Sequence, residues 1–147
     1  MFRGSSQHTC DPKGRLIVPS RFRDVIISGG GDGLMITKGN TPSLTAYTYD
    51  EWKAVEARIL ASKSPNVGAI KRFFIGNSQD CPCDKQGRIL IPKNLRTYAG
   101  IDKDLTLIGL LDRFEIWALD KWEAEDQKTI ESLTAGDFKN ELADLGL

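Results

Sequence analysis

The sequence CDPKGRLIVPSRFR, residues 10–23, recurs as CDKQGRILIPKNLR, residues 83–96, and this duplication decides the fold. Cys, Asp, Gly, Arg, Pro and a final Arg keep the same places in both segments. The likeness continues on either side, where FRGSSQ matches FIGNSQ upstream and LTAYTYDEW matches FEIWALDKW downstream. Two copies of one unit therefore account for most of the 147 residues, and we place them at residues 5–52 and 81–124.

Each copy has an Asp-x-x-Gly turn motif directly before its shared Arg. Asp11 can hydrogen-bond the main chain ahead of it, Pro12 fixes φ at the second turn position, and Gly14 tolerates a positive φ. The second copy keeps Asp84 and Gly87 and lacks only the proline. The motif predicts a tight hairpin turn with a glycine bulge in each copy.

Short regular elements are expected after each turn. The runs Leu-Ile-Val at 16–18 and Ile-Leu-Ile at 89–91 predict strands buried on both faces. Pro19 and Pro92 end these strands and suit the first turn of a short helix, which Gly100 closes in the second copy.

Another strand pair and an amphipathic helix complete each copy. Asp50 and Asp120 are expected to cap the two helices, and residues 62–68, SKSPNVG, to link the copies. A unit of about 50 residues buries too little apolar surface to be stable alone. The two copies are therefore expected to interleave strands and share one core, as a covalent pseudo-dimer of α+β, mainly β, class.

Composition and charge limit the classes of protein to which the chain can belong. The chain is 40% hydrophobic and 27% charged, as in a folded globular protein. The longest apolar run is too short to cross a bilayer, the start lacks a secretory signal, and three cysteines suit a reducing compartment, so we expect a cytoplasmic protein. Residues 1–23 hold five basic residues against one acidic, and residues 71–96 six against two, whereas ten acidic residues oppose four basic ones from 112 onward. Each copy of the duplicated segment is thus a cationic island.

These motifs resemble those of the MraZ family, bacterial transcriptional regulators of the division and cell-wall gene cluster, within the AbrB/SpoVT-like superfamily of swapped-hairpin DNA-binding proteins. The resemblance rests on MFRG at the start, the paired DPKGRLIVPSRFR and DKQGRILIPKNLR, and FEIWALDKW late in the chain, and it covers almost the whole sequence. It implies tandem swapped-hairpin β-barrel halves with flanking helices and a closed homo-oligomeric ring, often of eight subunits. It also implies binding to short repeats in promoter DNA at the nucleoid, usually as a repressor. Cys10 and Cys83 depart from the pattern, because larger aliphatic residues are expected before the Asp.

The expected DNA-binding residues surround the two turns. An arginine fork can donate two hydrogen bonds to O6 and N7 of guanine, so Arg15 and Arg88 are expected to read bases. Lysine supplies charge to phosphates, which is the role expected of Lys13 and Lys85. The family's Asp-x-x-x-Arg signature adds Asp11 and Asp84, and the full expected set is Arg3, Asp11, Lys13, Gly14, Arg15, Asp84, Lys85, Gly87 and Arg88, with Arg21 and Arg96 as further candidates for phosphate contact. The simpler alternative is that Arg15 forms only an exposed ion pair with Asp11, worth about 0–1 kcal/mol.

The residues raise three other possible functions, namely zinc binding, catalysis and protein scaffolding. His8, Cys10, Cys81 and Cys83 occupy corresponding places in the copies and could form a Cys3His zinc site, although their spacing lacks the usual Cys-x-x-Cys pattern. Catalysis is not expected, since the only histidine has no evident nucleophile or carboxylate beside it. No metal or other cofactor is therefore assigned. A ring-forming scaffold that binds proteins, with interfaces at Trp52, Trp117 and Trp122, is the main alternative to DNA binding.

Overall fold

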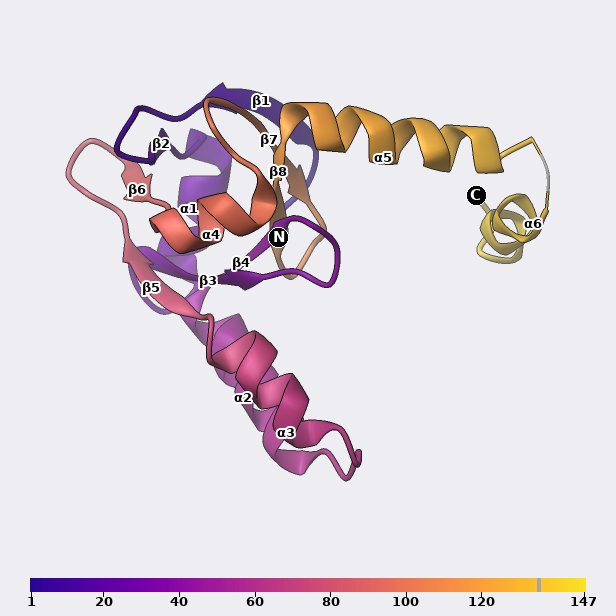
Figure 1. The fold of residues 1–147 in the computed structure, drawn as a ribbon, viewed down its shortest axis with the longest axis horizontal. Coiled ribbons are helices and arrows are strands. Elements are labelled where there is room, and N and C mark those ends of the chain that lie inside the picture. The colour runs from indigo at the N-terminus through magenta and orange to yellow at the C-terminus, as the bar shows by residue number, and fades with distance from the viewer. Residues whose placement is uncertain (135) are drawn as a thin grey trace.

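The chain is an α+β protein built around antiparallel β-structure, as expected (Figure 1). The computed structural model describes residues 1–134 and 136–147. The first copy contributes β1 (Ser5–Thr9), β2 (Arg15–Ile17), α1 (Ser20–Ser28), β3 (Gly33–Lys38), β4 (Leu44–Tyr47) and α2 (Tyr49–Ala61). The second contributes β5 (Gln79–Pro82), β6 (Arg88–Leu90), α4 (Lys93–Ala99), β7 (Asp104–Gly109), β8 (Phe114–Ala118) and α5 (Leu119–Ser132). Between the copies lie α3 (Val67–Ile70) and a π-helical turn, η1 (Lys71–Ile75), and α6 (Asp137–Asp144) follows the second copy.

Strands pair between the two copies. One antiparallel sheet has the order β1-β7-β8-β4-β3-β5, and β2 and β6 form a separate two-stranded ribbon. Exchanging every strand with its counterpart in the other copy maps both the sheet order and the ribbon onto themselves. The two copies therefore form the expected pseudo-dimer within one chain. Because β1 and β5 stand at opposite ends of the sheet, the described strands make an open sheet, and the expected barrel is not closed.

The predicted hairpins are also wrong, because the two strands on either side of each turn do not pair with each other. The chain does turn tightly after β1, but β1 pairs with β7 while β2 pairs with β6, so the two strands flanking the turn belong to different sheets. The same exchange separates β5, which pairs with β3, from β6. A turn motif fixes only local geometry, whereas strand partners are chosen by how the apolar surface of both copies is buried.

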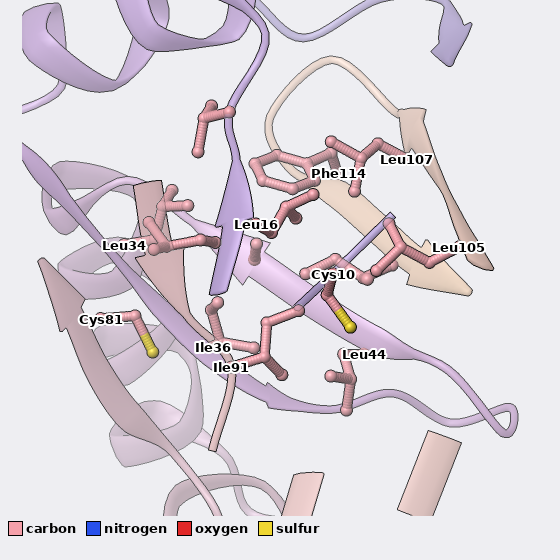
Figure 2. Close-up of a cluster of buried hydrophobic side chains, with 14 of the residues drawn as sticks. Cys10, Leu16, Leu34, Ile36, Leu44, Cys81, Ile91, Leu105, Leu107 and Phe114 are labelled. Carbon is pink, nitrogen blue, oxygen red and sulfur yellow. The ribbon is translucent and has the colours of Figure 1, made fainter. Parts of the chain in front are cut away.

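The core lies between the ribbon and the sheet and takes side chains from both copies (Figure 2). Leu16 of β2 and Ile89 of β6 are each 1% exposed, and they pack in one cluster with Ile36, Leu107 and Phe114. These inward side chains fasten the ribbon over the sheet.

The outward side of the ribbon was predicted wrongly. Ile17 is 63% exposed and Leu90 52%, although both were expected in strands buried on two faces. Successive strand residues point to opposite faces, and only the face with Leu16 and Ile89 meets the core.

The helix boundaries confirm some of the expected signals. Gly100 ends α4 with a left-handed φ of 66°, as expected. Pro19 and Pro92 precede their helices by one residue instead of lying in the first turn. Asp50 is not the cap of α2, because the Thr48 hydroxyl accepts the Glu51 N–H at 3.2 Å and Asp50 lies in the first turn. Similarly, α5 begins at Leu119 after Ala118, with Asp120 in its first turn.

The link between the copies is partly helical. The segment after α2 forms α3 and η1, which lie alongside α2 (Figure 1). Phe74 of η1 stacks on Trp52 of α2 at a centroid distance of 5.6 Å and also contacts Tyr47. These aromatic contacts form a second, smaller core. Within the described residues, no helix is both long and apolar enough to span a bilayer.

Candidate nucleic-acid interface

Both Asp-x-x-Gly motifs form the predicted tight turn. In the first, the Gly14 N–H donates to the Asp11 carbonyl at 2.9 Å and the Asp11 N–H donates to the Arg15 carbonyl at 3.0 Å. The second turn repeats this pattern between Gly87, Asp84 and Arg88 at 3.0 and 2.8 Å. Gly14 and Gly87 have φ of 91° and 76°, values that an L side chain rarely adopts. The glycines are therefore required by the turn that delivers each arginine.

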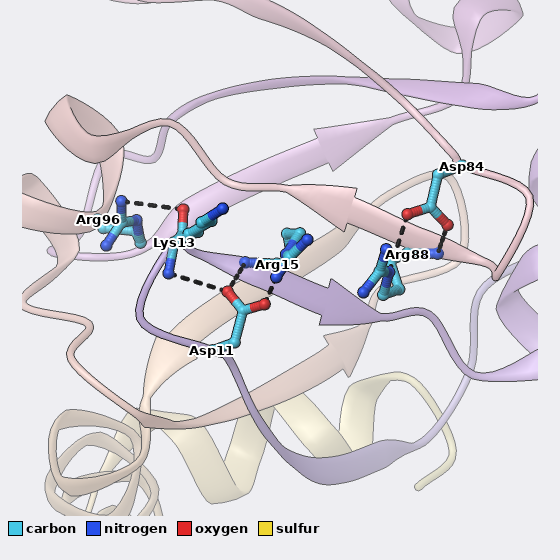
Figure 3. A network of polar contacts seen from close by, with 6 residues as sticks. All are labelled: Asp11, Lys13, Arg15, Asp84, Arg88 and Arg96. Carbon is cyan, nitrogen blue, oxygen red and sulfur yellow. Dashed lines mark hydrogen bonds and ion pairs between the residues drawn. The ribbon is translucent and has the colours of Figure 1, made fainter.

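Each aspartate binds the arginine four residues later through both its main chain and its side chain (Figure 3). The Arg15 N–H donates to Asp11 Oδ1 at 2.9 Å, and Arg15 Nε donates to Oδ2 at 2.5 Å. Arg88 makes the same two contacts with Asp84, at 2.9 and 2.8 Å. In both pairs the main-chain N–H of the arginine, followed by its guanidinium, holds the carboxyl pKa below its ordinary value.

These contacts orient the two guanidinium groups. A guanidinium carries five N–H donors, and the aspartate contact engages Nε, so the terminal Nη groups lie outside the pair. The side chains of Arg15 and Arg88 are 37% and 29% exposed. The ion pair thus engages the Nε edge of each guanidinium and leaves the Nη groups outside the aspartate contact.

The ribbon places Arg15 and Arg88 on one surface. Its register sets Arg15 opposite Leu90 and Ile17 opposite Arg88, with all four side chains on the face away from the core. Arg15, Ile17 and Arg88 line a single surface depression of about 690 Å³. The duplicated motif had placed each arginine beside its own turn, 73 residues from the other. The structure instead joins them in a single surface.

The two lysines lie exposed in the turns but not at equivalent positions. Lys13 is the third turn residue, whereas Lys85 is the second and Gln86 takes the third place. Both lysine side chains are open to solvent. Each end of the ribbon therefore carries one lysine, but the two lysines stand at different positions of their turns.

Arg96, a candidate for phosphate contact, binds the protein itself. Its Nε donates to the Ile91 carbonyl at 3.0 Å and an Nη to the Lys13 carbonyl at 3.4 Å. Its counterpart Arg23, to which sequence reasoning gave no individual role, lies beside the second turn and forms a two-bond ion pair with Asp32 at 2.9 and 2.5 Å. An arginine from the helix of the other copy therefore lies beside each turn, and Arg96 also hydrogen-bonds the first turn. The sequence did contain a signal for Arg23 and Arg96, because they are the shared final arginine of the two duplicated segments.

Arg3 and Arg21 lie apart from the turns. Arg3 stands before β1, and the turn follows its other end, so the length of the strand, roughly 17 Å, separates them. Arg21 donates to the Ser6 hydroxyl at 3.5 Å and lies over the Phe22 ring.

The possible zinc ligands are not assembled. His8 bonds the Ser6 hydroxyl at 2.7 Å, while the Cys10 thiol donates to the Asp102 carbonyl at 3.4 Å. Burial raises the pKa of Cys81 to about 12 and of Cys83 to about 11, so both thiols are protonated at neutral pH. Among the residues that the structure describes, no three His, Cys, Asp or Glu side chains are grouped to hold a metal ion.

Comparison with known proteins identifies the family of this chain. The model of the MraZ family, described as "MraZ protein, putative antitoxin-like", matches residues 1–71 and 74–141. The chain belongs to the MraZ family. MraZ relatives of similar length include the proteins named "Transcriptional regulator MraZ" of Desulforapulum autotrophicum and Desulfosudis oleivorans, which are 51% and 44% identical to this chain over the full length of both partners. The protein of the same name from Acetivibrio thermocellus is 42% identical, again over both full lengths.

Proposed function

We propose that this MraZ-family chain is a DNA-binding transcriptional regulator that reads promoter DNA with the β2–β6 ribbon. The observation that carries the proposal is that the ribbon brings Arg15 and Arg88 onto one exposed face, each oriented by its own aspartate. A two-stranded ribbon fits the major groove, and each arginine that binds a guanine discriminates by roughly 1–3 kcal/mol.

The remaining basic residues have supporting roles in this proposal. Lys13 and Lys85 contact phosphates on either side of the groove and set the register of the ribbon. Arg96 acts chiefly by holding the first turn, because its donors already bind main-chain oxygens. Arg3 and Arg21 could reach DNA only if it extends past the ribbon.

The proposed biological role is the one that membership of the MraZ family implies. The target is a set of short repeats in the promoter of the division and cell-wall gene cluster, and binding represses transcription. The protein then acts in the cytoplasm, at the nucleoid. The scaffold alternative is not favoured, because Trp52 and Trp117 are 6% and 3% exposed and Trp122 packs edge-on against Trp117 at 5.7 Å.

Ring assembly from copies of this chain, eight in the expected case, would supply the affinity that one ribbon lacks. Subunits that present ribbons around a ring can bind successive repeats together, so later contacts form at high effective concentration. Exposed apolar side chains support self-association: Ile70, Phe73 and Leu110 are 40–43% exposed and line one depression of about 540 Å³. Native mass spectrometry of the wild type and of Phe73→Asp tests this proposal. A ring predicts a multiple of the chain mass that falls in the variant, whereas a monomeric wild type would contradict it.

The DNA-reading proposal is tested by fluorescence anisotropy with the DNA upstream of the chain's own gene and a scrambled duplex of equal composition. Arg15→Ala and Arg88→Ala should each lose discrimination between the two duplexes while keeping the native mass. Arg58→Ala, an exposed arginine of α2, is the matched control and should retain it. If both ribbon variants discriminate as well as the wild type, the arginines do not read bases.

A further inference from the structure

The outward face of the ribbon carries two apolar side chains that the fold does not require. Leu16 and Ile89 supply the ribbon's contacts with the core, whereas Ile17 and Leu90 are 63% and 52% exposed. A strand with one solvated face normally places polar residues there. An exposed aliphatic residue at the same position of both copies indicates a contact made outside the subunit.

On this face of the ribbon the two apolar residues alternate with the two arginines, both along each strand and across the strand pair. Leu90 lies across from Arg15, and Ile17 lies across from Arg88. Each apolar side chain is therefore about 5 Å from one arginine across the ribbon and about 7 Å from the other along its strand. The rise between stacked bases is about 3.4 Å, so 7 Å corresponds to roughly two base-pair steps.

The chemistry of this surface favours DNA as the partner. Two oriented guanidinium groups flank the apolar pair, and Lys13 and Lys85 stand exposed at the turns. The major groove is a surface that presents acceptors for arginine next to an apolar group, because guanine offers O6 and N7 and thymine offers its methyl group.

We propose that Ile17 and Leu90 determine specificity by contacting thymine methyl groups within two base-pair steps of the guanines read by Arg88 and Arg15. The inference rests on the proposed function, which it extends from guanine recognition to a mixed guanine and thymine element. Burial of one methyl group by an aliphatic side chain is expected to strengthen binding about fourfold.

The test compares the upstream duplex synthesised with thymidine and with deoxyuridine, which differ only in that methyl group. The wild type should bind the deoxyuridine duplex about fourfold or more weakly, depending on how many methyl contacts are lost. In Ile17→Ala and Leu90→Ala the difference between the duplexes should shrink. Both side chains are exposed, so the variants are expected to fold, which circular dichroism verifies. Ile130→Ala, at a half-exposed position of α5, is the matched control and should show the wild-type difference.

The outcomes separate this inference from the proposed function. If the wild type prefers its upstream DNA to a scrambled duplex but binds thymidine and deoxyuridine forms equally, the methyl contact is refuted and DNA reading stands. If the wild type has no sequence preference, the proposed function itself fails. If Ile17→Ala and Leu90→Ala instead lower the native mass, the apolar pair serves contact between copies of the chain, and the inference is wrong.

Discussion

Arg96 of the second copy donates from Nη2 to the main-chain oxygen of Lys13 in the first copy, across 3.4 Å. The two residues are 83 positions apart, and they meet because α4 lies beside the turn that precedes β2. Besides pairing the two arginines in one ribbon, the duplication therefore places a helix of one copy against a turn of the other. A helix of the second copy thus supports the turn that precedes Arg15 in the first copy.

Arg96→Ala should weaken DNA binding without removing a phosphate contact. The loss of two hydrogen bonds from a half-buried cation should lower the free energy of unfolding by about 1–3 kcal/mol and loosen the first turn. The dependence of log affinity on log salt concentration should keep its wild-type slope, because no phosphate partner is lost. Chemical denaturation and anisotropy titrations at several salt concentrations measure both quantities. A decrease of about 0.9 in the slope would instead assign Arg96 to the DNA backbone.

Gly14→Ala should destabilise the chain more than Gly87→Ala. Both glycines have positive φ, so each substitution strains the main chain, by roughly 1 kcal/mol or more. A Cβ at Gly14 would stand 2.8 Å from the Ile91 main-chain oxygen, whereas at Gly87 it would meet only the Arg23 side chain, which can move. Gly68→Ala in α3 is the control and should be neutral or stabilising, because alanine favours helix there. Equal effects of the two turn substitutions on the denaturation midpoint would contradict the steric argument.

The sequence predicted the two-copy organisation and both turns because these depend on local signals. Asp and Gly at fixed spacing specify the turn whatever the flanking strands do, and both turns form as predicted. The exchange of strands is not a local property. Asp11 begins the same turn whether β1 pairs with β2 or, as here, with β7, so the joining of Arg15 and Arg88 in one ribbon could not be derived from the motif.

Two further differences between the predicted and the observed structure arise from tertiary contacts. Ile17 lies in an apolar run that resembles a fully buried strand, and only the position of the sheet reveals which face is free. Phe2 and Phe74 occupy matching places in the duplicated sequence but different surroundings. Phe2 packs on Phe22 and Phe114 in the main core, whereas Phe74 joins η1 and stacks on Trp52. An extra helical segment after α2 thus breaks the symmetry that the repeat suggests.

Acid should destabilise the chain partly through Asp11 and Asp84. Both carboxyls have a folded pKa below the ordinary 3.8, so their stabilising contribution is complete above pH 3.8 and is lost as pH falls through the lowered folded value. Asp11→Asn and Asp84→Asn should therefore flatten the decline in the free energy of unfolding below pH 4. Denaturation at pH 7, 4 and 3 measures this. Curves for both variants that run parallel to the wild-type curve would exclude the proposed contribution.

Lys13 and Lys85 should contribute to affinity without contributing to sequence preference. Each lysine that neutralises a phosphate releases counterions, so Lys13→Ala and Lys85→Ala should each lower the slope of log affinity against log salt concentration by about 0.9. Binding to upstream and scrambled duplexes should weaken together, because a phosphate contact carries no base information. Lys53→Ala, exposed on α2, should leave the slope unchanged.

The two lysines also differ in a way that the same titrations resolve. Lys13 occupies the third turn position and Lys85 the second, so the two ends of the ribbon cannot place their ammonium groups identically on a groove. If both face phosphates, the double variant should lose twice the slope of either single variant. If only one does, its single variant should match the double variant, and the ribbon would bind DNA with unequal ends. A change in sequence preference with an unchanged slope would mean that a lysine reads bases, contrary to the role proposed here.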